Sequence, residues 1–457
     1  LLIAGNTPLG VLFGAYAFLE ERVGLRWFYP GEAGTACPRR PTLSIAAFRD
    51  RQNPVFKSRS VTLLGVTRNG NMVETWDWIV RNRMHIGLPS KHFPEAMAER
   101  GAGTYLGGHV LMNLVPDGLF GEHPEYFALL NGARVPQGER TLVQGVNGKM
   151  VGQTSHRSQP CTSNPDVIER AGRGIADLFV RPGVAAPALY HFLNNDCNGW
   201  CECARCRALD PPEERDRPGG SVSTRFYRFI NEVAGRVWRG VPQADIWGYA
   251  YQNYRLPPTA AAPDPRLGLI LCDHGRCYRH SLGDPACEPN AWFRGMFEGW
   301  ARFPNRRNYY SYYTCFSEPA EGSVLSAPLE AVVAEDLCYM ARLGNTSWDI
   351  IAYPPDGSYA HLEERGQDSR PRRDYWRANM HMHYLQAKLA WNPNRDVEET
   401  LEDYYRGVFH KAAPEMKEFF ALLEDRIAAG EKTQTREEWQ RNECFIPCDK
   451  YFPAAYP

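Results

Sequence analysis

The chain has 457 residues, of which 43% are apolar, and its 52 Lys and Arg residues nearly balance its 53 Asp and Glu residues. The length exceeds what one simple domain needs, and the balanced charge argues against nucleic acid as the main partner because no basic excess is present to hold a phosphate backbone. The sequence also shows no apolar run near the roughly 18 residues of a membrane span.

The first 50 residues predict part of a small α/β domain. Thr7 is a good N-cap with Pro8 at the first helical position, and apolar residues then line one helix face up to Gly24. Short strands are expected at residues 1–4 and 25–28. Since no basic segment with a cleavage site opens the chain, no targeting signal is read, and we expect this domain to be truncated.

Strand-like and helix-like segments alternate over most of the remaining chain. Strands are expected at residues 56–64, 105–110, 188–195, 245–251, 267–272, 308–314 and 346–352. Such alternation predicts a parallel sheet, which closes as a (β/α)₈ TIM-like barrel. An open doubly wound sheet is the alternative, but no Gly-rich phosphate-binding turn follows any of the strands.

The predicted organisation has three parts. Residues 1–50 form the partial N-terminal α/β domain, residues 51–395 form the barrel with the catalytic site, and residues 396–457 form C-terminal helices and a tail. The apolar residues around 397–408 and 416–423 have helical spacing, which predicts two helices in the last part.

A polar run from Asn194 to Cys203 follows one of the expected strands directly. The functional residues of barrels lie where the strands end, so Asp196 is the first catalytic candidate and Glu202 is a further candidate carboxylate. The amide of Asn195 is expected to orient a sugar beside them. Asn and Asp are also favoured in turns, which leaves a turn cap as the alternative role of Asp196.

Other strand ends are rich in aromatic and amide side chains, which suit sugar rings. Asp349 lies in an apolar strand and needs a partner if it is buried, so it is the best second carboxylate. The expected substrate-binding residues are Asn195, His109, Tyr249, Tyr251, Asn253, Tyr312 and Trp348. Packing between barrel and helices is the alternative for most of the tyrosines.

Thirteen cysteines is an odd number, so at least one thiol has no disulfide partner within the chain. The spacing of Cys201, Cys203 and Cys206 predicts a structural zinc ion, a disulfide or free thiols, none of them catalytic. The fourth ligand of a zinc ion is expected from Cys197, Cys272 or His274. We expect no cofactor to be required for catalysis.

Many segments together resemble known families. GNTPLGVLFGAYAFLEERVGLRWFYPGEAG is similar to the end of the N-terminal domain of family 67 alpha-glucuronidases. The segments HPEYFALLNGAR, CTSNPDVIE, NNDCNGWCECARCRALD and LAWNPNRDVEETLEDYYRGVFHKAAP resemble the domain of unknown function 4838, with the likeness running from about Gly5 to Arg426. Part of that group is glycoside hydrolase family 163, whose members are endo-acting beta-N-acetylglucosaminidases.

The resemblance implies roles for individual residues. The family's Asn-Asp at a strand end matches Asn195 and Asp196, and its Cys-x-Cys-x-x-Cys matches the three clustered cysteines. Two departures are visible, because Ser311 stands where the family often has a carboxylate and a Glu near the last strand is missing. Asp349 or Glu202 is then the expected proton donor.

The expected activity is hydrolysis of a glycan or polysaccharide by a secreted or periplasmic bacterial protein. If the substrate carries a 2-acetamido group, its carbonyl serves as the nucleophile, and the protein needs only an orienting and a donating carboxylate. The alternative is a non-catalytic glycan-binding barrel that has lost its acid/base.

Overall fold

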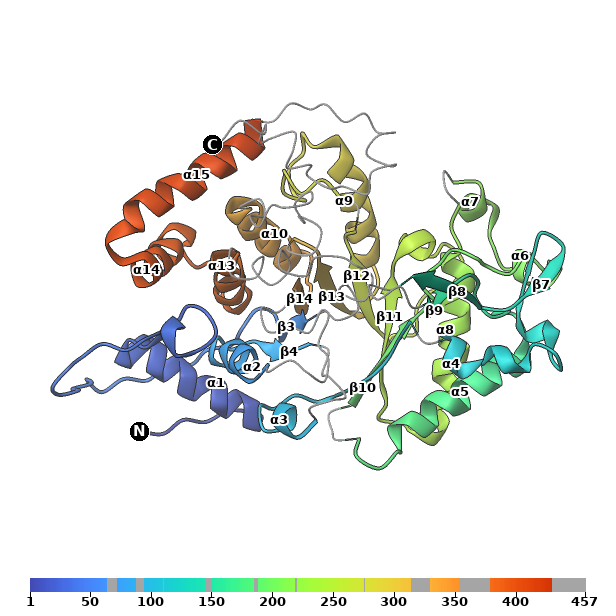
Figure 1. Ribbon diagram of the computed structural model, residues 1–457, viewed down its shortest axis with the longest axis horizontal. Helices are drawn as coiled ribbons and strands as arrows, with labels where there is room; N and C mark the ends of the chain where they lie inside the picture. The colour runs from blue at the N-terminus through green and yellow to red at the C-terminus, as the bar shows by residue number, and fades with distance from the viewer. Residues whose placement is uncertain are drawn as a thin grey trace.

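The computed structural model describes residues 1–63, 72–87, 94–109, 111–144, 150–184, 188–217, 220–274, 276–313, 329–352 and 379–429. Its centre is a curled sheet of eight parallel strands with helices packed around it (Figure 1). None of the described helices combines the length and the apolar character that crossing a bilayer requires.

The strands follow one another around the sheet in chain order, and the last strand returns to the first. The hydrogen-bonded order is β4-β3-β14-β13-β12-β11-β10-β5. Asp349 of β14 lies opposite Ser60 of β3, whereas β4 and β5 show no backbone pairing within the described residues. Because the first and last strands of a doubly wound sheet do not pair, the order confirms the barrel and excludes that alternative.

The strand bounds agree with the expected segments, with one addition. The strands are β3 (Ser58–Leu63), β4 (His85–Ile86), β5 (Thr104–His109), β10 (Ala188–Leu193), β11 (Asp245–Ala250), β12 (Gly268–Cys272), β13 (Arg306–Ser311) and β14 (Ser347–Ala352). The sequence pattern missed β4, since two residues are too few to show an alternation.

Helices cover the outside of this sheet. Those up to β11 are α1 (Pro8–Phe18), α2 (Val73–Arg81), α3 (Pro94–Ala98), α4 (Leu111–Leu114), α5 (Pro165–Phe179), α6 (Ala204–Arg207), α7 (Pro212–Arg215) and α8 (Ser223–Gly240). After β12 follow α9 (Glu288–Ala301), α10 (Glu330–Arg342), α13 (Met380–Trp391), α14 (Val397–Phe409) and α15 (Ala413–Ala429). The two expected C-terminal helices are α14 and α15, and each helix is longer than the segment predicted for it.

Three small antiparallel pairs within the described part of the chain lie outside the barrel. They are β1 (Arg26–Trp27) with β2 (Thr35–Ala36), β6 (Ala128–Leu130) with β7 (Ala133–Val135), and β8 (Gly138–Gln144) with β9 (Met150–His156). The short helical turns are η1 (Leu19–Val23), η2 (Glu32–Gly34), η3 (Asp117–Leu119), η4 (Pro124–Tyr126), η5 (Gln252–Tyr254) and η6 (His410–Ala412). The β6–β7 and β8–β9 pairs belong to the long connection between β5 and β10.

The N-terminal helix begins and ends as the sequence predicts. The Thr7 hydroxyl accepts a hydrogen bond from the Gly10 amide at 3.0 Å, and Gly24 ends the helical segment with a φ of 91°. The strand expected at residues 25–28 is β1. The strand expected at residues 1–4 is wrong, because Leu1 and Leu2 are exposed and have no neighbouring strand.

A buried ion cluster joins this N-terminal segment to the barrel helices. Glu20 pairs with Lys388 of α13 at 2.7 Å and with Arg83, next to the end of α2, at 3.0 Å. Burial raises the pKa of Glu20, but the two cations outweigh it and lower the pKa to about 2. The division at residues 50 and 395 stays a prediction, and this cluster ties the first part firmly to the second.

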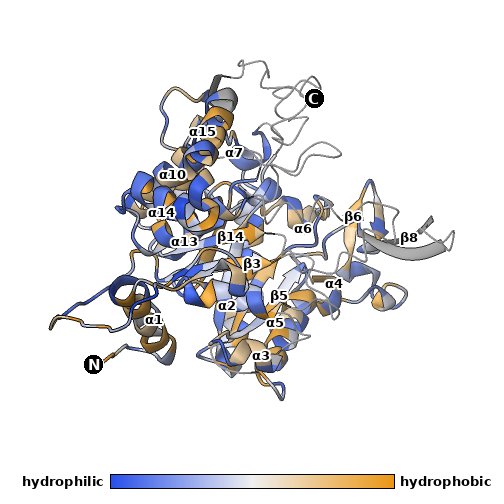
Figure 2. Cartoon of the chain, turned by 60° about the vertical axis from the view of Figure 1, so that its left-hand side comes forward, coloured by the Kyte–Doolittle hydropathy of each residue, from blue (hydrophilic) through white to orange (hydrophobic). Residues whose placement is uncertain are grey.

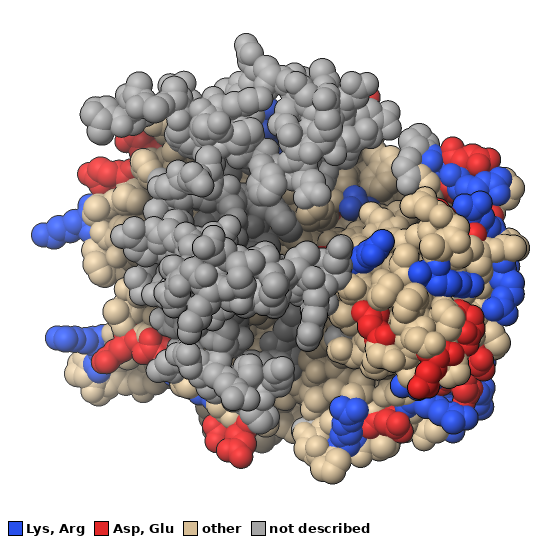
Figure 3. All heavy atoms as spheres, turned by 45° about the vertical axis from the view of Figure 1, so that its right-hand side comes forward, with Lys and Arg blue, Asp and Glu red and all other residues tan. Residues whose placement is uncertain are grey.

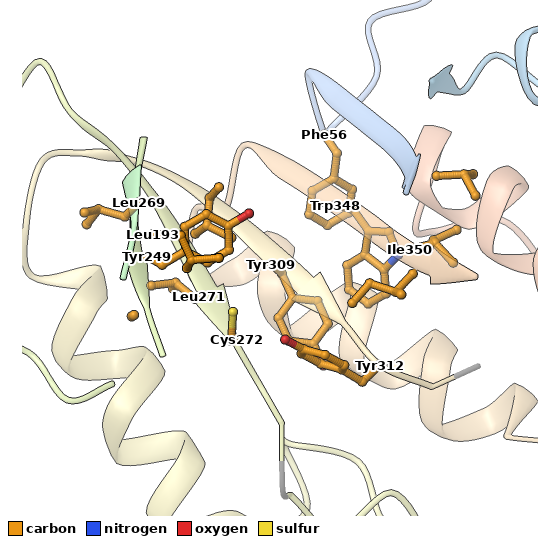
Figure 4. Close-up of a cluster of buried hydrophobic side chains, with 14 of the residues drawn as sticks. Phe56, Leu193, Tyr249, Leu269, Leu271, Cys272, Tyr309, Tyr312, Trp348 and Ile350 are labelled. Atoms are coloured by element: carbon orange, nitrogen blue, oxygen red, sulfur yellow. The ribbon is translucent and has the colours of Figure 1, made fainter. Parts of the chain in front are cut away.

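The core lies between the sheet and the helices. Figure 2 shows hydrophilic and hydrophobic residues interspersed along α10, α14 and α15, as expected of helices with one buried face. On α8, Phe226, Phe229, Val233 and Val237 are buried at helical spacing, which confirms the predicted stripe. In Figure 4, Trp348 lies between Phe56 and Tyr309, and the ring centroids are 5.8 Å and 4.7 Å apart.

A second buried ion network fixes the connection that follows β12. The fully buried Arg276 binds Asp273 at 3.0 Å and also pairs with Asp336 of α10. Tyr309 and Tyr313 donate their hydroxyls to the two carboxylates. Burial raises the pKa of Asp336 to about 6, against the lowering effect of Arg276.

Replacing Arg276 with Met should lower the free energy of unfolding by about 3–5 kcal/mol, because two buried carboxylates lose their cation. Urea unfolding followed by circular dichroism measures the change. The matched control is Arg173→Met, since the Arg173–Glu169 pair is mostly exposed and should contribute about 1 kcal/mol or less. Equal losses in both variants would show that the Arg276 network does not stabilise the fold.

Candidate active site

The mouth of the barrel is the end at which the parallel strands finish, and the connection after β10 forms one wall of it. Asn195 in this connection is completely buried. Its side-chain amide donates to Gln137 and to the Ser158 carbonyl, both at 2.9 Å, and its oxygen accepts from the Met112 amide at 3.1 Å. Asn195 is therefore a positioning residue, which corrects the expectation that it binds substrate.

Asp196, the next residue, turns toward solvent. Its side chain is 50% exposed, and one oxygen accepts a hydrogen bond from the Gln252 side chain at 2.8 Å. The Asp196 amide donates to His156 Nδ1 at 2.7 Å, and His109 Nε2 lies 4.0 Å from the carboxylate. Gln252 thus holds the candidate carboxylate, His156 holds the backbone that carries it, and the carboxylate is still accessible.

Aromatic rings continue from Asp196 around the mouth. The centroids of His109 and Tyr251 are 6.3 Å apart, those of Tyr251 and His274 6.4 Å, and those of His274 and Tyr312 5.5 Å. Burial and, to a smaller extent, the Asp196 charge raise the pKa of Tyr251. Burial and the neighbouring His109 lower the pKa of His156. Such rings offer flat apolar surface with polar edges.

An inner layer of side chains lies below the mouth, inside the barrel. The hydroxyl of Tyr249 lies 2.8 Å from His191 Nδ1, and the hydroxyl of Tyr105 lies 3.4 Å from that of Tyr249 and contacts His191 too. The ring of Tyr310 is 6.0 Å from that of Tyr249. Tyr249, predicted to bind substrate, is nearly fully buried here and forms the floor of the mouth.

Asp349 belongs to this inner layer. It is 4% exposed, and the Thr62 hydroxyl lies 3.0 Å from both of its oxygens. Burial raises the pKa of Asp349 to about 7, although hydrogen bonds from Ser60 and Thr62 lower it in part. Near neutral pH a large fraction of Asp349 therefore stays protonated beneath the mouth, where an ordinary carboxyl group would be ionised.

Three of the predicted site residues are placed elsewhere. Trp348 alternates with Asp349 along β14, so it points outward into the core and is completely buried (Figure 4). Asn253 accepts a hydrogen bond from the Trp200 indole at 2.9 Å, which gives it a scaffold role. Glu202 accepts from the Asn131 amide at 3.0 Å and pairs with Arg207, so these contacts tie it to the β6–β7 hairpin and α6.

Ser311, where the resemblance implies a carboxylate, shares the outward face of β13 with Tyr309. Its hydroxyl donates to the Asp349 carbonyl at 2.8 Å. The connections after β13 and β14, residues 314–328 and 353–378, lie outside the described residues. The described mouth is therefore built from the ends of β5, β10, β11 and β12 and from Tyr312.

Some residues of the site are absent from the prediction made from the sequence. Gln252 follows an aromatic strand end, so the sequence pattern could have indicated it. His156 comes from a hairpin outside the barrel, and nothing in the sequence pattern indicates that it lies at the site. Figure 3 shows acidic and basic side chains intermingled on the described part of the face that it presents. A surface hollow of about 750 Å³ lies outside the barrel wall, along α5, and does not include the mouth.

Among the residues that the structure describes, two groups of side chains have the composition of metal sites. Cys201, Cys203 and Cys206 converge with Cys161, which replaces the expected fourth ligands Cys197, Cys272 and His274. Cys272 is buried in the barrel, and Cys197 accepts a hydrogen bond from Gln159 instead. The second group is Cys277, His280 and Cys287, in the connection after β12.

Comparison with known families identifies the chain at the level of its domain. The model of the domain of unknown function DUF4838 matches residues 29–421. The chain belongs to this family. No curated protein matches the chain.

Several solved structures that resemble this DUF4838 protein are named as glycoside hydrolases. A family GH115 4-O-methyl-alpha-glucuronidase, BtGH115A, with specificity for decorated arabinogalactans, is 12% identical with a TM-score of 0.50, covering 94% of this chain and 52% of its own. A family 89 glycoside hydrolase from Clostridium perfringens, in complex with PUGNAc, is 12% identical with a TM-score of 0.46, covering 94% and 48%. The chain thus spans about half the length of these structures, and the likeness to the first supports the barrel fold.

Replacing Asp349 with Asn should flatten the pH dependence of stability. The folded state holds the Asp349 proton up to about pH 7, whereas the unfolded chain releases it near its ordinary value of 3.8. Stability contributed by the neutral form is complete below pH 4 and is lost as the pH rises toward 7. Thermal unfolding of the wild type and of Asp349→Asn at pH 4, 5.5 and 7 measures this loss.

The control for this comparison is Asp196→Asn, which changes a half-exposed carboxylate. The wild type and the control should lose melting temperature together as the pH rises, while Asp349→Asn loses less. Parallel curves for all three proteins would show that Asp349 does not titrate in this range.

Proposed function

We propose that this DUF4838 protein is a glycoside hydrolase whose substrate, an oligosaccharide or polysaccharide, binds at the mouth of the barrel. The observation that carries the proposal is the half-exposed Asp196 carboxylate, which Gln252 holds at 2.8 Å beside the rings of His109 and Tyr251. Cleavage of a glycosidic bond requires two suitably placed carboxyl groups, or one together with an acetamido group of the substrate, and Asp196 supplies one of them beside rings on which a sugar can stack.

The two carboxyl groups take different roles in this proposal. Asp196 contacts the reacting sugar and orients or polarises it at the mouth. Asp349 lies on the floor, and its pKa of about 7 suits a proton donor at neutral pH. A sugar that reaches the floor therefore meets an acid below it and a carboxylate beside it.

A substrate with a 2-acetamido group fits this arrangement best. Its own carbonyl oxygen attacks the anomeric carbon as the leaving group takes a proton, so the protein needs no carboxylate nucleophile. Asp196 then orients the acetamide nitrogen. Because long glycans occur outside cells, a secreted or periplasmic location is part of the proposal.

A glycan-binding protein without hydrolytic activity is the second candidate. Its supporting observation is the burial of Asp349, which is 4% exposed and whose two oxygens both lie near the Thr62 hydroxyl. If this acid has only a structural role, the mouth still offers aromatic rings and Asp196 to a bound sugar.

Asp196→Asn should abolish hydrolysis and leave the melting temperature nearly unchanged, since the side chain is half exposed. The assay incubates wild type and variant with a library of glycans, with and without N-acetylhexosamine, and reads the products by mass spectrometry. Asp216→Asn, an exposed carboxylate elsewhere, is the control and should keep full activity.

Two further results decide between the candidates. Glu202→Gln should hydrolyse glycans like the wild type, because Glu202 is bound to Asn131 and Arg207, and a large loss there would make Glu202 the donor. If the wild type binds glycans but releases no product from any of them, the binding function replaces the hydrolase.

A further inference from the structure

Four cysteines from separate parts of the chain meet beside the mouth. Cys161 precedes α5, and Cys201, Cys203 and Cys206 lie in the connection after β10. The sulfur of Cys161 is 3.7 Å from that of Cys201 and 3.8 Å from those of Cys203 and Cys206. All four sulfurs lie within 4.8 Å of one another.

These separations are those of a metal tetrahedron. A zinc–sulfur bond of about 2.3 Å places the sulfurs of a tetrahedral site about 3.8 Å apart, since the edge is about 1.63 times the bond. A disulfide would instead bring two of the sulfurs to about 2.05 Å. The equal distances from Cys161 to its three neighbours match the first geometry.

The surroundings suit a cluster of thiolates. The Leu129 amide donates to the sulfur of Cys201 at 3.3 Å, and Arg134 donates to the same sulfur at 3.5 Å. The buried Arg225 binds the Cys201 carbonyl at 2.6 Å. Four thiolates around a divalent ion carry two negative charges. Arg134 offsets part of this charge, whereas Arg225, which also pairs with Asp210 at 2.8 Å, holds the Cys201 backbone in place.

We propose that Cys161, Cys201, Cys203 and Cys206 bind one structural zinc ion. With four protein ligands the ion has no open position for water, so it supplies no Lewis acid. It fastens the connection after β10 to the segment before α5 and to the β6–β7 hairpin. The Cys161 amide donates to the carbonyl of Tyr126, just before β6, and the Glu202 amide donates to the carbonyl of Leu129 in β6, both at 2.8 Å.

The ion also stabilises the part of this connection that carries Asp196. The connection is held at one end by β10 and at the other end by the cysteine cluster. The first cysteine of the cluster in this connection, Cys201, comes only five residues after Asp196. Zinc removal should therefore loosen Asp196 without touching it. This consequence for activity rests on the proposed function, whereas the zinc ion itself does not.

The test measures the metal content of the purified protein, grown with zinc, by elemental analysis. Cys161→Ser should contain one zinc ion less per chain than the wild type. Cys197→Ser is the matched control, because Cys197 lies in the same connection but outside the cluster, and it should keep the wild-type content. Cys277→Ser accounts for any metal held by the second group.

A second measurement covers a Cys161→Ser variant that does not fold. Titration of the wild-type protein with a mercurial reagent should release the ion as four thiols react, and substitution with cobalt should give the intense visible bands of a tetrahedral tetrathiolate. Asp196→Asn should keep its zinc, so a failure of the proposed hydrolysis and a failure of this proposal are distinguishable.

Three results would overturn the proposal. The first is wild-type protein without metal whose mass shows disulfides among the four cysteines. The second is equal zinc content in wild type and Cys161→Ser. The third is a bound ion with a coordinated water, which would make the site open.

Discussion

The pairing of β14 with β3 is the constraint on which the functional end of the molecule depends. It joins the last strand to the first, so that strands far apart in sequence end on one rim. The same pairing sets Asp349 opposite Ser60 and within reach of the Thr62 hydroxyl. A shift of this register by one residue would turn Asp349 outward and Trp348 inward.

Above that floor, the mouth is organised by hydrogen bonds that are themselves buried. Asn195 uses its amide entirely on Gln137, Ser158 and Met112, and so it fixes the backbone from which Asp196 projects. Buried polar groups with every partner present specify one arrangement, because any alternative leaves some of them unsatisfied. A rigid scaffold thus presents an accessible carboxylate at the mouth of the barrel.

The regular part of the fold was predictable from the sequence, while the site was predictable only in part. The pattern located the long strands because apolar residues mark them locally, and the strand end at Asn195–Asp196 carried a clear signal. It could not show that the side chain of Asn195 forms its hydrogen bonds with residues some 40–80 positions away in the sequence. It also could not show that Cys161 completes the cysteine cluster, since this convergence arises only when α5 packs beside the barrel.

The buried cluster around Glu20 has a consequence for folding during synthesis, because it joins residues that are made at very different times. Lys388 binds Asn82, 306 residues before it, and Arg26 binds Asp403, 377 residues after it. Contacts so distant in the chain form slowly and late. During synthesis α1 and β3 leave the ribosome long before α13 and β14. The surfaces of α1 and β3 that these later elements cover therefore stay exposed until α13 and β14 have emerged. Chaperones would find their targets in these early segments.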